Sequence, residues 1–172
     1  SLAAGGTITV DNAGAGNAIA AAGTGTVTLD ANGAASDLLV NDGILSVNGA
    51  ITLTADNDVT FLATGDIAST AGAISVRADA DGGGTSSGAL TMVDGALINA
   101  GSGTIALLAD ENITVGQVTT TNTGATAVTL TSTEGGIVDG GDTGGADVIA
   151  GGRLVIDAVT GVGNGAALET TV

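Results

Sequence analysis

One short phrase recurs along the whole chain: two aliphatic residues separated by one residue, which is Thr, Ser, Ala or Val, with a glycine among the four residues before the first. The phrase occurs seven times, starting at Ile8, Val27, Ile51, Ile74, Ile105, Val128 and Leu154. Successive starts lie 19, 24, 23, 31, 23 and 26 residues apart, about 24 on average. Such a period is typical of repeat architectures, so the sequence predicts seven stacked repeats with these seven residues in one column.

Each repeat is predicted to contain several short strands. In the repeat that starts at Ile51, the phrase returns eight residues later as Val59-Thr-Phe61, and Ile67 marks a third segment. Aliphatic residues alternate with threonines in these segments, which is the pattern of a strand with one buried face. The chain also has 31 glycines and many β-branched residues, a composition that favours strands and turns over helices.

The predicted fold class is all-β, a parallel β-solenoid of seven coils with about 24 residues per coil. A two-sheet sandwich has strands of similar spacing, but it gives no reason for one phrase to return in the same phase. Stacking one repeat per coil instead lines up like residues in a narrow aliphatic core. We expect residues 1–172 to form a single solenoid segment, a fragment or module of a longer repetitive protein. The extra residues of the fourth repeat, 81–88, are predicted to form a loop.

Composition excludes several classes of function. The formal net charge is −16, with only two Lys or Arg residues, so the surface repels nucleic acids and anionic membranes. Apolar runs are too short for a membrane-spanning helix, and we expect no membrane insertion. The chain contains no His, Cys, Trp or Tyr, which removes the usual bases, thiol nucleophiles and soft metal ligands.

Two segments carry a family resemblance. They are Gly49-Ala-Ile-Thr-Leu-Thr-Ala-Asp-Asn-Asp-Val-Thr-Phe61, followed by Gly65-Asp-Ile67, and Gly103-Thr-Ile-Ala-Leu-Leu-Ala-Asp-Glu-Asn-Ile-Thr-Val115. They resemble the repeats of filamentous haemagglutinin-type adhesins and other giant bacterial surface proteins, and the resemblance covers nearly the whole chain. It implies a right-handed parallel β-helix that is secreted or held at the bacterial cell surface. The function it implies is that of a structural or adhesive fibre or adhesin stalk.

An enzymatic function is not expected. Glycosidase chemistry needs only two suitably placed carboxylates, and acids are plentiful here. However, no Trp or Tyr is present to stack on a sugar ring, and the two arginines, Arg77 and Arg153, belong to different repeats. Two alternative functions stay open: a calcium-stiffened surface-layer or biofilm matrix fibre, and a carbohydrate-binding β-helix with host or matrix glycans as partners.

Clusters of acids follow the repeated phrase in three repeats and are candidate calcium ligands. These clusters begin five residues after the aligned isoleucine, and the candidates are Asp56, Asp58, Asp79, Asp81 and Asp110. Stacked coils would bring such carboxylates near one another, and Ca²⁺ accepts six to eight oxygen ligands of this kind. The simpler interpretation, which we favour, is that these side chains accept hydrogen bonds from turn N–H groups and face water. Calcium is thus the one candidate cofactor, and otherwise none is expected.

A second acidic segment, Asp139-Gly-Gly-Asp-Thr-Gly-Gly-Ala-Asp147, resembles the Gly/Asp nonapeptides that bind Ca²⁺ in β-rolls. Those nonapeptides recur in tandem, because each site is built from two turns. The phrase occurs once here, so the sequence predicts a flexible turn at this segment.

The expected partner is a second copy of the chain. A solenoid needs polar caps over its end coils. Neither Ser1-Leu-Ala-Ala nor Ala167-Leu-Glu-Thr-Thr-Val172 has the charged or helical character of such a cap. We therefore expect end-to-end stacking of coils into rods or filaments.

Overall fold

The computed structural model describes residues 1–82, 88–163 and 166–172, and over these ranges the chain is a parallel β-solenoid of seven coils. All the strands lie in three parallel sheets, as predicted for an all-β solenoid. Within the described ranges, no helix is long and apolar enough to cross a membrane. The loop predicted at residues 81–88 lies mostly outside these ranges, since 83–87 are not described.

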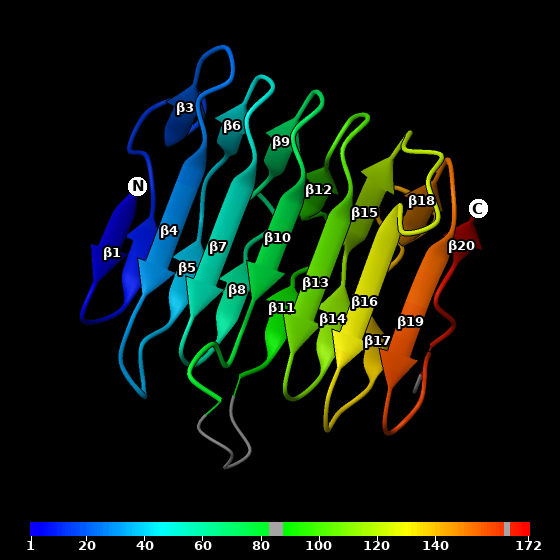
Figure 1. Cartoon of the computed structure of the whole chain (residues 1–172). Helices are drawn as coiled ribbons and strands as arrows, with labels where there is room; N and C mark the ends of the chain where they lie inside the picture. The colour runs from blue at the N-terminus through cyan, green and yellow to red at the C-terminus, as the bar shows by residue number, and fades with distance from the viewer. Residues whose placement is uncertain (83–87, 164–165) are drawn as a thin grey trace.

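Each coil contributes one strand to each sheet, except that, among the described residues, the last coil has no named strand in the second sheet. The three sheets therefore have seven, six and seven strands. The first sheet contains β1 (Leu2–Ala4), β4 (Val27–Ala31), β7 (Ile51–Ala55), β10 (Ile74–Arg77), β13 (Ile105–Ala109), β16 (Val128–Ser132) and β19 (Leu154–Ala158). The second contains β2 (Ile8–Val10), β5 (Leu38–Val40), β8 (Val59–Phe61), β11 (Leu90–Met92), β14 (Ile113–Val115) and β17 (Ile137–Asp139). The third contains β3 (Ile19–Ala21), β6 (Ile44–Ser46), β9 (Ile67–Ser69), β12 (Leu97–Asn99), β15 (Gln117–Thr120), β18 (Val148–Ala150) and β20 (Thr170–Thr171). Figure 1 shows the coils following one another along a single axis, from β1 at one end to β19 and β20 at the other.

The register of the first sheet confirms six of the seven residues predicted to form one column. Cα partners join Val27, Ile51, Ile74, Ile105, Val128 and Leu154 in that order. Like residues therefore stack on like residues through most of the chain, which is the arrangement that the constant phase of the phrase predicts.

Ile8 is the exception, and its placement in the column was wrong. It begins β2 in the second sheet, where its partner is Leu38. The N-terminal strand of the first sheet is β1, whose Leu2 pairs with Leu29. The error has a simple cause: Ile-Thr-Val is equally suited to either sheet, as Ile113-Thr-Val115 in β14 demonstrates, whereas the two alanines of β1 give no strand signal.

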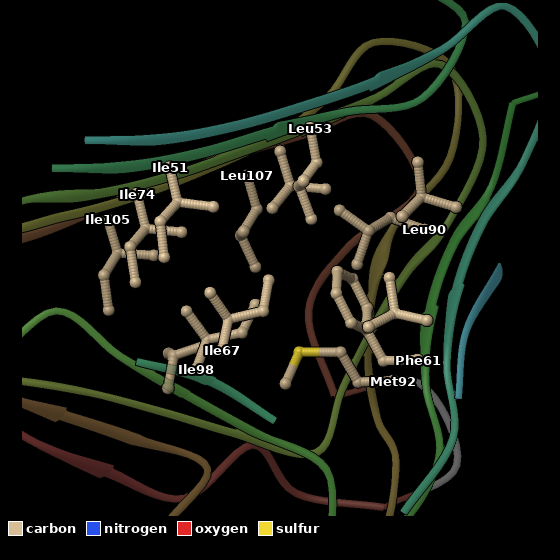
Figure 2. Close-up of a cluster of buried hydrophobic side chains, with 14 of the residues drawn as sticks. Ile51, Leu53, Phe61, Ile67, Ile74, Leu90, Met92, Ile98, Ile105 and Leu107 are labelled. Atoms are coloured by element: carbon tan, nitrogen blue, oxygen red, sulfur yellow. The ribbon is translucent and has the colours of Figure 1, made fainter. Parts of the chain in front are cut away.

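Aliphatic side chains from all three sheets meet inside the coils. Figure 2 shows Ile51, Ile74 and Ile105 in a row, one from each of three successive coils. Phe61, the single aromatic residue, is fully buried beside its register partner Met92. Within a strand, the residues that point outward between the buried ones are only half-buried. In β8, for example, Thr60 is half-buried between the buried Val59 and Phe61. In strands of the interior coils, such as β7 and β8, alternation thus separates the dry core from the wet surface, as predicted.

A column of glycines forms the corner that leads into the first sheet. Gly49 and Gly72 lie two residues before β7 and β10, respectively. A Cβ atom on Gly72 would lie 2.0 Å from the carbonyl oxygen of Gly49, and a Cβ on Gly49 would lie 2.0 Å from that of Gly25. No side chain fits at such a distance, so glycine is the residue that permits the coils to approach closely here.

The aliphatic core is tested by Leu107→Asp. Leu107 is 1% exposed, so the substitution removes a packed side chain and buries a charge without a partner. We expect the free energy of unfolding to fall by about 4 kcal/mol or more. Ala106→Asp, on the exposed face of the same strand, is the control and should change stability little. Urea unfolding followed by circular dichroism measures both, and equal midpoints for the two variants would contradict the assignment of faces.

The glycine corner is tested by Gly72→Ala. The added methyl group clashes with the Gly49 carbonyl, and we expect a loss of about 1–3 kcal/mol or more in unfolding free energy. Gly5→Ala is the matched control, because a Cβ on Gly5 meets nothing within 4 Å. Its effect should stay within about 0.5 kcal/mol. If Gly72→Ala is as stable as Gly5→Ala, close approach at the corner does not explain the glycine.

Candidate functional site

The five sequence-predicted calcium ligands lie in the turns that follow first-sheet strands β7, β10 and β13. Asp56 and Asp79 are buried, Asp58 and Asp110 are half-buried, and Asp81 is exposed. Asp79 has a φ of 53°, in the left-handed region that residues other than glycine rarely adopt.

Several of these carboxylates bond to a neighbouring coil. The Asp56 carboxylate accepts a 2.5 Å hydrogen bond from the N–H of Gly33, and Asp110 accepts one of 2.5 Å from the Thr133 hydroxyl. Asp58 accepts a bond of 2.9 Å from the N–H of Ala89. These contacts are the kind expected when acids close turns. Calcium binding at these five residues stays a prediction.

The contact made by Asp58 belongs to a series just before the second-sheet strands. In this series a side-chain oxygen accepts a hydrogen bond from the N–H of the equivalent residue in the next coil. Such bonds run from Asp37 to Thr7, from Asp58 to Asp37, from Ala89 to Asp58 and from Gly136 to Asn112, with the donor given first. Side-chain oxygens of Thr, Asp and Asn just before the second-sheet strands thus link one coil to the next, because an N–H at a strand start otherwise lacks an acceptor.

A different acidic group is brought together near the C-terminal end. One carboxylate oxygen each from Asp139, Asp147 and Glu169 lies within 4.8 Å of the other two. Among the residues that the structure describes, this is the one set of three acids so close, and it includes none of the five predicted ligands. Asp139 ends β17, Asp147 directly precedes β18, and Glu169 directly precedes β20. We call these three residues the carboxylate cluster.

Asp147 is the buried member of the carboxylate cluster. Its side chain is 0% exposed, whereas Asp139 is half-buried and Glu169 is exposed. One oxygen, Oδ2, accepts a 2.9 Å hydrogen bond from the N–H of Glu169. The other oxygen, Oδ1, is buried and has no hydrogen-bond partner. A buried carboxylate with one oxygen unpaired is costly, so this residue needs an explanation.

The environment shifts the proton affinity of this residue. Burial raises the pKa of Asp147 from its ordinary value of 3.8 to about 6, with the hydrogen bond from the Glu169 N–H working in the opposite direction. The carboxylates of Asp139 and Glu169 raise the pKa further. Negative charge is therefore poorly accommodated at this point in the free chain.

The sequence did not indicate the carboxylate cluster. It predicted a flexible turn for residues 139–147, yet the ends of that segment, Asp139 and Asp147, meet in the structure. Glu169 was missed because β20 is only Thr170–Thr171, which shows no alternation. One signal was present: Asp66 and Asp147 each directly precede a third-sheet strand. An acid before such a strand accepts a bond from the next coil, as Asp66 does from the Leu97 N–H.

The raised pKa of Asp147 predicts a pH dependence of stability. Between about pH 4 and pH 6, the folded chain holds a proton on Asp147 that the unfolded chain has released. The contribution of this residue to the free energy of unfolding therefore falls as the pH rises through this window, and is constant above it. Asp147→Asn should remove that fall, whereas Asp66→Asn, an equal change of charge, should retain it. Urea unfolding at several pH values in EDTA provides the measurement, and an unchanged pH profile for Asp147→Asn would refute the assignment.

Comparisons with known protein families, with curated proteins and with solved structures found no match to this chain.

Proposed function

We propose that this chain is a structural or adhesive segment of an extracellular fibre, such as the stalk of a bacterial surface adhesin. The observation that carries the proposal is the continuous register of three parallel sheets around an aliphatic core. Each coil adds about 4.8 Å of length, so seven coils extend about 34 Å. A solenoid of this kind gains length simply by adding coils, which is what a stalk requires.

The chemistry available on the chain supports a role without catalysis. With no His, Cys, Lys, Trp or Tyr, it lacks the common bases, nucleophiles and sugar-stacking platforms. Its two arginines are separated along the axis, with Arg77 in β10 and Arg153 directly before β19. The surface hollow lined by Asp142, Gly145 and Glu169, among others, is open rather than enclosed. These features favour a shaft over an active-site cleft.

The resemblance of the repeats to those of adhesins supports a location outside the cell, and the charge is compatible with it. A net charge of −16 keeps long fibres soluble and resists their sideways association. We therefore place the segment in a secreted or surface-attached fibre.

The end strands of the first sheet support association along the axis. Among the described residues, β1 pairs only with β4, and β19 pairs only with β16. Leu2 in β1 is 52% exposed, and Leu154 and Ile156 in β19 are half-buried although their column partners Val128 and Leu130 are fully buried. Another coil placed on either end would cover these side chains and pair the open strand edge. We propose that a second copy of the chain supplies that coil.

The proposal is tested by Ala3→Pro. The carbonyl of Ala4 accepts a bond from Asn32 in the second coil. Because backbone groups alternate in direction along a parallel strand, the N–H of Ala3 points away from β4 toward the open edge. Proline at this exposed position removes that donor with no loss to the internal ladder.

We expect the parent chain to form rods visible by electron microscopy and to sediment as a concentration-dependent series of oligomers. Ala3→Pro should sediment mainly as the single chain. Ala3→Thr, which keeps the N–H, should give the same oligomers as the parent. A parent chain that stays a single particle at every concentration would refute axial self-association. Equal oligomers for the parent and Ala3→Pro would show that β1 is not the contact.

A further inference from the structure

We propose that Asp139, Asp147 and Glu169 bind a divalent cation of the calcium class, and that this cation fastens the last coil to the one before it. The three residues come from three separate segments: Asp139 ends β17, Asp147 directly precedes β18 and Glu169 directly precedes β20. Figure 1 shows these strands grouped at the C-terminal end of the solenoid. The inference does not depend on the proposed function, and it concerns none of the five acids predicted from the sequence.

The first observation is the convergence of charge. Three carboxylate oxygens within 4.8 Å of one another repel, because like charges lie close together and one of the three, on Asp147, is buried. Arg77 and Arg153 are the only cationic side chains in the sequence. Arg77 donates a hydrogen bond to the Asp79 carbonyl, and among the described residues no hydrogen bond or ion pair joins either arginine to the carboxylate cluster. Within that part of the chain, no positive side chain is paired with this group.

The second observation is independent of the first. Asp147 is fully buried, and its Oδ1 atom has no hydrogen-bond partner. Asp66 occupies the equivalent position three coils away and accepts the corresponding hydrogen bond from the N–H of Leu97. Because Asp66 is exposed, its other lone pairs can accept hydrogen bonds from water. Asp147 is buried, so bulk water does not reach its side chain. A cation held between Asp147, the half-buried Asp139 and the exposed Glu169 would give the unpaired oxygen a partner.

The ligand type selects the cation. Every donor in the cluster is a carboxylate oxygen, and the chain contains no His or Cys, so metals that prefer nitrogen or sulfur are disfavoured. Three carboxylates provide three to six oxygens, which water can complete to the six to eight that Ca²⁺ accepts. The spacing comes from the stacking of coils rather than from an octahedral cage, and Ca²⁺ tolerates such irregular geometry better than Mg²⁺ does.

The position explains what binding would do. The last third-sheet strand, β20, is held to β18 by only two residue pairs, Val148 with Thr170 and Ile149 with Thr171. The N–H of Glu169 already bonds to Asp147, and the cation would add a link between their side chains. Ion binding thus favours the docked form of the last coil over the frayed form by mass action.

The experiment is calorimetric titration of the full chain with CaCl₂ after removal of metals, at pH 7.5. We expect one saturable site, and Asp147→Asn should weaken its affinity at least tenfold. Asp66→Asn is the matched control, because Asp66 occupies the equivalent position and makes the same backbone contact. Asp58→Asn is a second control, which tests the five calcium ligands predicted from the sequence. Neither control should change the affinity.

Hydrogen exchange gives a second readout. Calcium should slow exchange at residues 148–150 and 170–171 in the parent chain but not in Asp147→Asn. If Asp147→Asn does not fold, Glu169→Gln replaces it, since Glu169 is exposed and its backbone contacts are kept. Absence of saturable binding in the parent, or undiminished binding in the cluster variants, would overturn the proposal. Loss of binding in Asp58→Asn alone would place the site among the five acids predicted from the sequence instead. Tighter binding of MgCl₂ than of CaCl₂ would overturn the choice of calcium.

Discussion

The backbone ladder between successive coils is the constraint on which the rest of this structure depends. It holds equivalent residues about 4.8 Å apart, so each position must tolerate a close copy of itself above and below. Aliphatic residues gain from this arrangement, and Ile51, Ile74 and Ile105 form a continuous dry column. At the glycine corner before the first sheet, the same spacing excludes any side chain, because a Cβ on Gly72 would lie 2.0 Å from the carbonyl oxygen of Gly49.

Carboxylates respond to the same constraint in two ways. Several acids accept a hydrogen bond from the next coil while keeping access to water, as Asp58 and Asp66 do. The acid then stabilises the ladder because it pairs an N–H at the start of a strand. Asp147 makes the same backbone contact but is buried, with Asp139 and Glu169 close by. A proton or a bound cation would relieve the repulsion there, beyond what the hydrogen bond from the Glu169 N–H provides, and this sets the cluster apart from the other described acids.

The proposed role in a fibre and the proposed cation site both concern the ends of the stack. Interior coils are held on both sides, whereas β1 and β19 each have one partner among the described residues. A shaft transmits force only if its junctions are as firm as its interior. Axial pairing would provide that firmness between copies, and an ion at Asp147 would provide it within the last coil.

The sequence by itself determined the period, the solenoid and the inward or outward direction of most side chains, because stacking in register repeats one local pattern in every coil. It identified where acids follow the first sheet, as at Asp56, but not which acids meet. Only the tertiary structure assigned Ile8 to the second sheet, since Ile-Thr-Val fits two sheets equally well. Only the tertiary structure joined Asp139, Asp147 and Glu169. Their meeting depends on the paths of irregular loops and on the short strand Thr170–Thr171, and neither leaves a periodic signal in the chain.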